Sequence, residues 1–205
     1  MVPVPAPSPL VPAAAPRRAA DAWGWESFAG RIAELAAVGG AARLSLAFGL
    51  VREAQRRGEP AAWVAAGAGS FYPPDAAACG VRLEALPVVF VPGLAAAARA
   101  ADTLLRSGGF GLVVVDVVGA AGDLPAPLAT RLAGLARKHD AAVVFLAEAA
   151  EGAPSLTPLV GLRCAARRAE AGPGRFVCRA EALKDKRRGP GWAHEEIRRG
   201  PVGLR

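Results

Sequence analysis

Apolar positions in the middle of the chain form short uniform runs, and longer segments with apolar residues at helical spacing lie between them. The uniform runs have the length and composition of strands buried on both faces, and they cover residues 31–38, 61–66, 86–91, 112–118 and 141–147. The intervening segments predict helices over residues 44–57, 73–80, 94–106 and 127–138. Strands that alternate with helices in this way predict an α/β fold with a mostly parallel central sheet flanked by helices.

The pattern changes after residue 160. Residues 161–170 and 175–184 are extended and partly alternating, and the turn residues 171–174 separate them. This arrangement predicts an antiparallel β hairpin. A basic turn over residues 184–191 and a last edge strand over residues 192–198 complete the predicted sheet.

The start of the chain has a different composition. Residues 1–20 are rich in Pro and Ala and show no periodic pattern, so we expect a disordered tail ahead of one domain at residues 21–205. No apolar run reaches the roughly 18 residues that span a bilayer, and the start lacks the pattern of a secretion signal. We therefore expect a cytoplasmic protein without a membrane partner.

Positive charge is concentrated in the C-terminal part. Residues 163–205 hold twelve Arg or Lys and five Asp or Glu, which accounts for the whole formal net charge of +7. A neutral body with a basic end favours an acidic partner, and DNA is the first candidate.

The candidate DNA contacts lie on the hairpin and on the turn that follows it. They are Arg163, Arg167, Arg175, Arg179, Lys184, Lys186, Arg187 and Arg188. Alternate residues of a strand share a face, so Arg163 and Arg167 are expected on one face and Arg168 on the other. Trp192 is a candidate stacking face for bases, and contacts of this kind give affinity without sequence preference. The alternative is an ordinary solvated turn.

Residues 30–46 have the outline of a strand, a tight loop and a helix that binds phosphate. Such a loop uses glycines to wrap the phosphates, a Lys for their charge and a Ser or Thr for Mg²⁺. At the corresponding positions this chain has Ala37, Ala42, Arg43 and Leu44. We therefore expect no catalysis, no cofactor and no metal site. Weak nucleotide binding stays open, because Gly39, Gly40 and Arg43 offer backbone donors and one positive charge at a helix N-terminus.

Two further groups are candidates for function. Asp116 ends the most apolar strand, at the edge of the sheet where α/β proteins place ligands, and it either belongs to the degenerate nucleotide site or caps a loop. Trp23, Trp25 and Phe28 lie close together ahead of the first strand. They either cover an edge of the core or anchor a protein partner.

Several short motifs in residues 30–200 resemble the core domain of the RecA recombinase family. They are Gly30-Arg31-Ile32-x-Glu34-Leu35, Val113-Val114-Val115-Asp116, Val143-Val144-Phe145-Leu146-Ala147-Glu148 and Leu183-Lys184-Asp185-Lys186. The resemblance implies a RecA-like core, in which Asp116 takes the place of the family's magnesium-site Asp and Glu148 that of its nucleotide-sensing Gln.

A RecA-like core of this length that lacks the phosphate-loop residues and ends in a basic segment is similar to the ImuA proteins. That resemblance implies a non-catalytic adaptor in DNA-damage-induced translesion mutagenesis, with RecA, an ImuB-type relative of Y-family polymerases and weakly held DNA as partners. The alternatives are a SulA-type division inhibitor, a RecA-filament antagonist and an ATPase with an unorthodox site.

Overall fold

Eight strands form one sheet in the computed structural model, which describes residues 23–37, 42–67, 70–120, 122–149 and 152–199. In spatial order the strands are β3 (Val88–Val91), β2 (Ala61–Ala66), β4 (Leu112–Asp116), β5 (Ala142–Glu148), β1 (Arg31–Ala37), β6 (Leu162–Glu170), β7 (Arg175–Asp185) and β8 (Ala193–Arg199). The first six run parallel, and β7 pairs antiparallel with both β6 and β8. The predicted α/β class with a mostly parallel sheet and a C-terminal antiparallel hairpin is confirmed.

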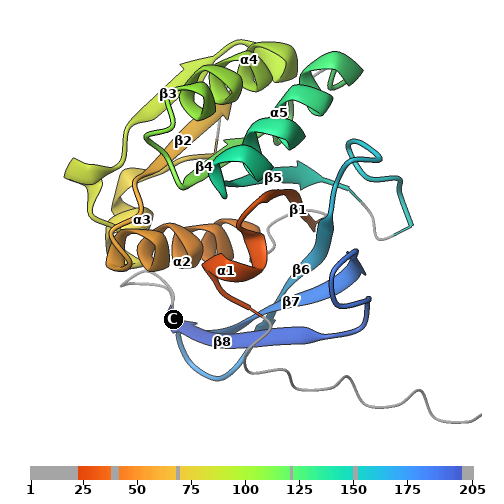
Figure 1. Cartoon of the computed structure of the whole chain (residues 1–205). Helices are drawn as coiled ribbons and strands as arrows, with labels where there is room; N and C mark the ends of the chain where they lie inside the picture. Colours follow the sequence, from red (N-terminus) through yellow and green to blue (C-terminus); the bar gives the residue numbers. More distant parts are fainter. Residues whose placement is uncertain (1–22, 38–41, 68–69, 121, 150–151, 200–205) are drawn as a thin grey trace, which may run out of the picture.

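The helices lie on both faces of the sheet (Figure 1). They are α1 (Trp25–Phe28), α2 (Arg43–Arg56), α3 (Pro73–Ala78), α4 (Gly93–Arg106) and α5 (Ala126–His139), and a 3₁₀ turn spans Leu83–Ala85. The core on the first face contains buried residues of α1, α2 and α3, and the core on the second face contains those of α4 and α5. Strands β1, β2, β4 and β5 are therefore buried from both sides, apart from Glu148 at the end of β5, which explains their largely apolar sequences.

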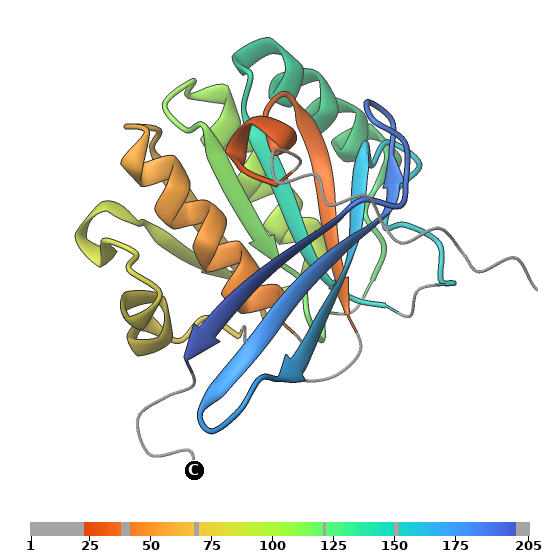
Figure 2. The same cartoon turned by 90° about the horizontal axis from the view of Figure 1, so that it is seen from below.

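The two faces are not covered equally. The core beneath α2 extends across β6 and β7, where it includes Cys178, Ala180 and Ala182. Helices α4 and α5 pack on strands β1 to β5. Figure 2 shows β6, β7 and β8 in front of α2, curled around it. Their second face, which we call the outer face, points away from α2.

A buried ionic network joins the start of β1 to the end of β7. Arg31 Nη1 lies 2.7 Å from Asp185 Oδ1, and Arg31 Nε donates to the Ser27 carbonyl at 2.7 Å. The Asp185 carboxylate also accepts a hydrogen bond from Trp192 Nε1 at 3.0 Å and one from the Arg187 amide at 2.9 Å. Burial alone would raise the pKa of Asp185, but these hydrogen bonds outweigh it and hold the pKa below its ordinary value.

A β-bulge sets the direction of the side chains at the end of β7. Arg163 of β6 lies opposite Lys184, but the next residue, Cys164, lies opposite Ala182. Leu183 is therefore the extra residue. The shift by one position moves Lys184 to the outer face, whereas strict alternation would place it on the α2 side together with Ala182.

The observed boundaries differ from the predicted ones in a few places. The third strand begins at Val88 and not at Leu86, because the 3₁₀ turn precedes it. The fourth strand ends at Asp116, two residues earlier than predicted. Helix α1 was not predicted, since four residues are too few to show a helical period. The predicted tail at residues 1–20 lies outside the described residues.

Among the described residues, no helix has both the length and the apolar character needed to cross a bilayer.

We expect the Arg31–Asp185 pair to be essential for stability. Replacing one partner leaves the other as an unpaired buried charge, so Arg31→Met or Asp185→Asn should lower the free energy of unfolding by about 3–5 kcal/mol. The double replacement Arg31→Met with Asp185→Leu should recover part of that loss, as measured by urea unfolding.

The same pair predicts a pH dependence. Because the folded-state pKa of Asp185 is lowered, its contribution is fully present above the unfolded pKa of about 3.9 and is lost as pH falls through the folded pKa. Below about pH 4, the wild-type chain should thus lose stability more steeply than Asp185→Asn. Equal slopes for the two proteins, or a stable Arg31→Met single variant, would contradict the assigned role.

Candidate functional site

The carboxyl ends of the parallel strands form the first candidate site. Arg43, the first residue of α2, is buried, and its Nη1 donates to the carbonyl of Ala37 at the end of β1 over 3.1 Å. Its Nε has no hydrogen-bond partner among the described residues. Leu44 is half-buried against the core under α2, and Gly39 and Gly40 lie outside the described residues. The described part of the predicted phosphate loop therefore holds Arg43 against the end of β1.

Asp116 lies in the interior at the end of β4. Its side chain accepts hydrogen bonds from the Ser70 amide at 3.0 Å, from the Ser70 hydroxyl and from the Val118 amide at 3.2 Å. Both carboxylate oxygens are thus used to hold the segments that follow β2 and β4. This geometry matches the loop-capping alternative for Asp116.

A cavity opens at the same edge, on the side of α4. Its volume is about 380 Å³, and its lining consists of Leu94, Val117, Gly119, Ala120, Gly122, Ala147, Glu148 and Leu156. Among the described lining residues, Glu148 carries a charge and the others are apolar or glycine. In the part of the chain that the structure describes, no three His, Cys, Asp or Glu residues are grouped so that they could hold a metal ion.

The outer face of β6–β8 is the second candidate site. Across the strands, Arg175 lies opposite Arg199, Arg167 opposite Arg179, and Lys184 opposite Arg163. Cys178, Ala180 and Ala182 point to the α2 core, so the odd-numbered residues of β7 up to Glu181 point outward. The bulge brings Lys184 to the same face. The structure therefore assembles most of the predicted DNA contacts on one surface.

The charges on this face differ in their surroundings. Arg179 is held by Glu195 at 2.6 Å and by Glu181 at 3.8 Å. Lys186, Arg187 and Arg188 are exposed in the turn after β7, and Lys186 Nζ donates to the Pro158 carbonyl at 3.1 Å. The pKa of Lys184 is lowered, first by partial burial and then by the nearby charge of Lys186. The described acids thus offset the positive charge in the middle of β7 more than at its ends.

Arg163 departs from the sequence prediction. It shares a face with Arg167, as expected, but its side chain is buried, and its Nε lies 3.0 Å from Glu34 Oε1. Its guanidinium also donates to the Ala153 carbonyl, and the Leu156 amide donates to the other oxygen of Glu34 at 2.9 Å. The segment after β5 therefore covers this ion pair. The prediction that Arg163 contacts DNA is therefore corrected, because the side chain is buried and Glu34 neutralises its charge.

The aromatic residues that were predicted to bind bases or a protein partner are more buried than such a role requires. Trp192, predicted as a stacking face, is 6% exposed and bonded to Asp185. Phe28, a candidate partner anchor, is fully buried.

Trp23 is half-buried between Phe28, at a ring distance of 5.0 Å, and His194, at 5.1 Å with parallel rings. Trp25 is also half-buried, and its Nε1 donates to the Gly111 carbonyl at 3.3 Å. Phe28 belongs to the core, and the two tryptophans retain only part of their surface for a partner.

One basic residue of the outer face, Arg199, was not among the predicted DNA contacts. Arg199 ends β8 and is exposed directly opposite Arg175. The last strand was predicted to end at residue 198, one residue too early; the alternation of Glu195 and Ile197, continued by one step, would have placed Arg199 on the same face.

We predict a structural role for Asp116. Asp116→Ala should lower the free energy of unfolding by about 3 kcal/mol, because the amides of Ser70 and Val118 lose their buried acceptor. Asp123→Ala changes an exposed acid on the following loop and should alter stability by less than about 0.5 kcal/mol. Both values are measured by urea unfolding. An increase in the melting temperature with Mg-ATP that Asp116→Ala abolishes would instead give this carboxylate a nucleotide-binding role.

The chain was compared with models of protein families and with curated proteins. No family model matches it, and no curated protein matches it.

Proposed function

We propose that this chain is a non-catalytic adaptor with a RecA-like core that acts in DNA-damage-induced translesion mutagenesis in the cytoplasm. It binds RecA or an ImuB-type relative of Y-family polymerases, and it contacts DNA weakly through the outer face of β6–β8. The motifs in residues 30–200 support the RecA-like part of the proposal, and so does the order of strands and helices over the same residues.

The observation that carries the DNA contact is the clustering of basic residues, four of them exposed and Lys184 half-buried, along the outer face and in the turn after β7. Arg175, Arg199, Lys184, Lys186 and Arg187 come from the two ends of β7, the end of β8 and the turn between these strands. In the part of the chain that the structure describes, α4 and α5 make their main contacts with β1 to β5. An exposed group of Arg and Lys attracts the phosphate backbone without regard to base sequence.

The site at the carboxyl ends of the parallel strands supports the non-catalytic part of the proposal. In the resemblance to RecA, Asp116 corresponds to the magnesium-site residue and Arg43 to the lysine of the phosphate loop. Here the Asp116 carboxylate is occupied by Ser70 and Val118, and one Arg43 nitrogen is occupied by the Ala37 carbonyl. A nucleotide would have to displace these internal hydrogen bonds, and each displaced buried group costs about 1–3 kcal/mol.

The proposal predicts a stable protein complex and separable DNA binding. On a sizing column, the chain should co-elute with RecA or with the ImuB-type partner, each tested with and without single-stranded DNA. The variant Lys184→Ala, Lys186→Ala, Arg187→Ala should still co-elute, but its affinity for fluorescently labelled DNA at about 50 mM salt should fall roughly tenfold or more. The matched control is Arg99→Ala, Arg137→Ala, Lys138→Ala, which removes three exposed charges from α4 and α5.

The two measurements test the adaptor function and the DNA contact separately. Elution of the chain alone in every mixture would overturn the adaptor function and favour a division inhibitor or an unorthodox nucleotide binder. Equal losses of DNA affinity in the triple variant and its control would overturn DNA contact through the turn after β7.

A further inference from the structure

We propose that the outer face binds double-stranded DNA laid along β7, with the phosphates held at two basic ends about 30 Å apart. This inference rests on the proposed function, because it specifies the form of DNA that the same face takes. The first end consists of Arg175 and Arg199, and the second of Lys184 and Lys186, with Arg187 in the adjoining turn, where its guanidinium lies beside Gly30.

The spacing of the two ends follows from the strand. Arg175 and Lys184 are nine positions apart in β7, and they lie on the same face because of the bulge. At about 3.3 Å per residue, nine positions correspond to about 30 Å. B-form DNA rises about 3.4 Å per base pair, so this distance matches about nine base pairs, close to one helical turn.

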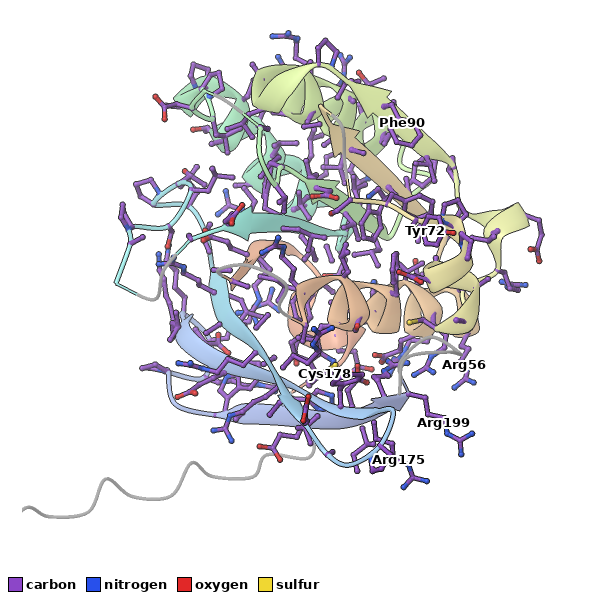
Figure 3. All side chains as sticks on the ribbon, turned by 180° about the vertical axis from the view of Figure 1, so that it is seen from behind. Arg56, Tyr72, Phe90, Arg175, Cys178 and Arg199 are labelled. Carbon is purple, nitrogen blue, oxygen red and sulfur yellow. The ribbon has the colours of Figure 1, made fainter. Side chains whose placement is uncertain are left out.

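The Arg175–Arg199 end has charges that the fold itself does not use. The two residues lie directly opposite each other across β7 and β8, and both are exposed. Figure 3 shows their side chains at the same end of the sheet. Like charges opposite each other destabilise a sheet. Within the described part of the chain, neither guanidinium forms an ion pair, so both are available to phosphates.

The middle of the outer face differs from its ends. Glu195 and Glu181 lie within 2.6 Å and 3.8 Å of Arg179, and Ile197, with 67% of its surface exposed, lies opposite Val177. A ligand that uses both ends must therefore bridge a weakly charged centre. Duplex DNA, which is stiff over about 150 base pairs, spans this distance without loss of flexibility, whereas a single strand must first be ordered.

The aromatic side chains of this part of the chain do not favour unpaired bases. Trp192 is buried, and Phe176 lies on the α2 side beneath the Arg168 guanidinium, 4.8 Å from the ring centre. Single-strand binding proteins add about 1–3 kcal/mol per base through exposed aromatic stacking. The described outer face offers charged and aliphatic side chains without an aromatic ring, and the higher charge density of a duplex then favours it over a single strand.

Hairpin duplexes of 6, 12 and 18 base pairs test the bridging directly by fluorescence anisotropy at several salt concentrations. Affinity should rise about tenfold or more between 6 and 12 base pairs, because only the longer duplex reaches both ends, and then change little. A 12-nucleotide single strand should bind about tenfold more weakly than the 12-base-pair duplex.

The variant Arg175→Ala with Arg199→Ala should abolish the gain between 6 and 12 base pairs. It should also reduce the slope of log affinity against log salt by about 2, since each phosphate contact contributes about 0.9. Arg99→Ala with Arg137→Ala is the matched control on the helical side. Circular dichroism and thermal unfolding confirm that each variant is folded.

Three results would overturn this inference, and the third would also overturn the DNA contact of the proposed function. Equal or tighter binding of the single strand would overturn the preference for a duplex, while the DNA contact of the proposed function would stand. Loss of affinity in the Lys184, Lys186 and Arg187 variant alone would overturn the two-ended contact. Unchanged affinity in both sets of variants would overturn the DNA contact of the proposed function as well.

Discussion

The buried pair between Arg31 and Asp185 fixes the C-terminal antiparallel strands to the parallel sheet. Arg31 begins β1 and Asp185 ends β7, so the pair joins residues 154 positions apart in the chain. The carboxylate also holds the indole of Trp192, which stands just before β8, and the amide of Arg187 in the turn. One charge pair therefore sets where β7 ends, how the basic turn is oriented and where β8 begins. The high cost of an unpaired buried charge makes this arrangement specific.

The incomplete cover of the sheet determines which charges can act. Glu34 and Arg163 neutralise each other beneath the segment that follows β5, whereas Arg175 and Arg199 face solvent on the part that α4 and α5 do not reach. At the opposite end of β7, the bulge adds Lys184 to the same face. The parallel half of the sheet thus forms the core and the antiparallel half presents charge, and the proposed DNA contact depends on this division.

The sequence predicted the helices well wherever the helical period was long, as in α2 and α4, whose ends differ from the predicted ones by at most one residue. It did not predict the bulge: Leu183 breaks the alternation that Cys178, Ala180 and Ala182 follow, but one apolar residue at an outward position does not by itself mark an extra residue in a strand. It could not distinguish Arg163 from Arg167 either, because the difference lies in Glu34, which comes beside Arg163 only through the pairing of β1 with β6. The burial of Trp192 depends in the same way on Asp185 and Arg31. Candidate residues could thus be chosen by type, but their exposure was set by contacts distant in sequence.

The three lysines of the chain, Lys138, Lys184 and Lys186, allow the most direct test of the central claim that the outer face binds DNA. The measurement is the rate of acetylation of each lysine by mass spectrometry, with and without a 12-base-pair duplex. The account predicts that DNA slows acetylation of Lys184 and Lys186 and leaves Lys138, exposed on α5, unchanged. Unchanged rates at all three lysines under saturating DNA, or protection of Lys138 alone, would contradict it.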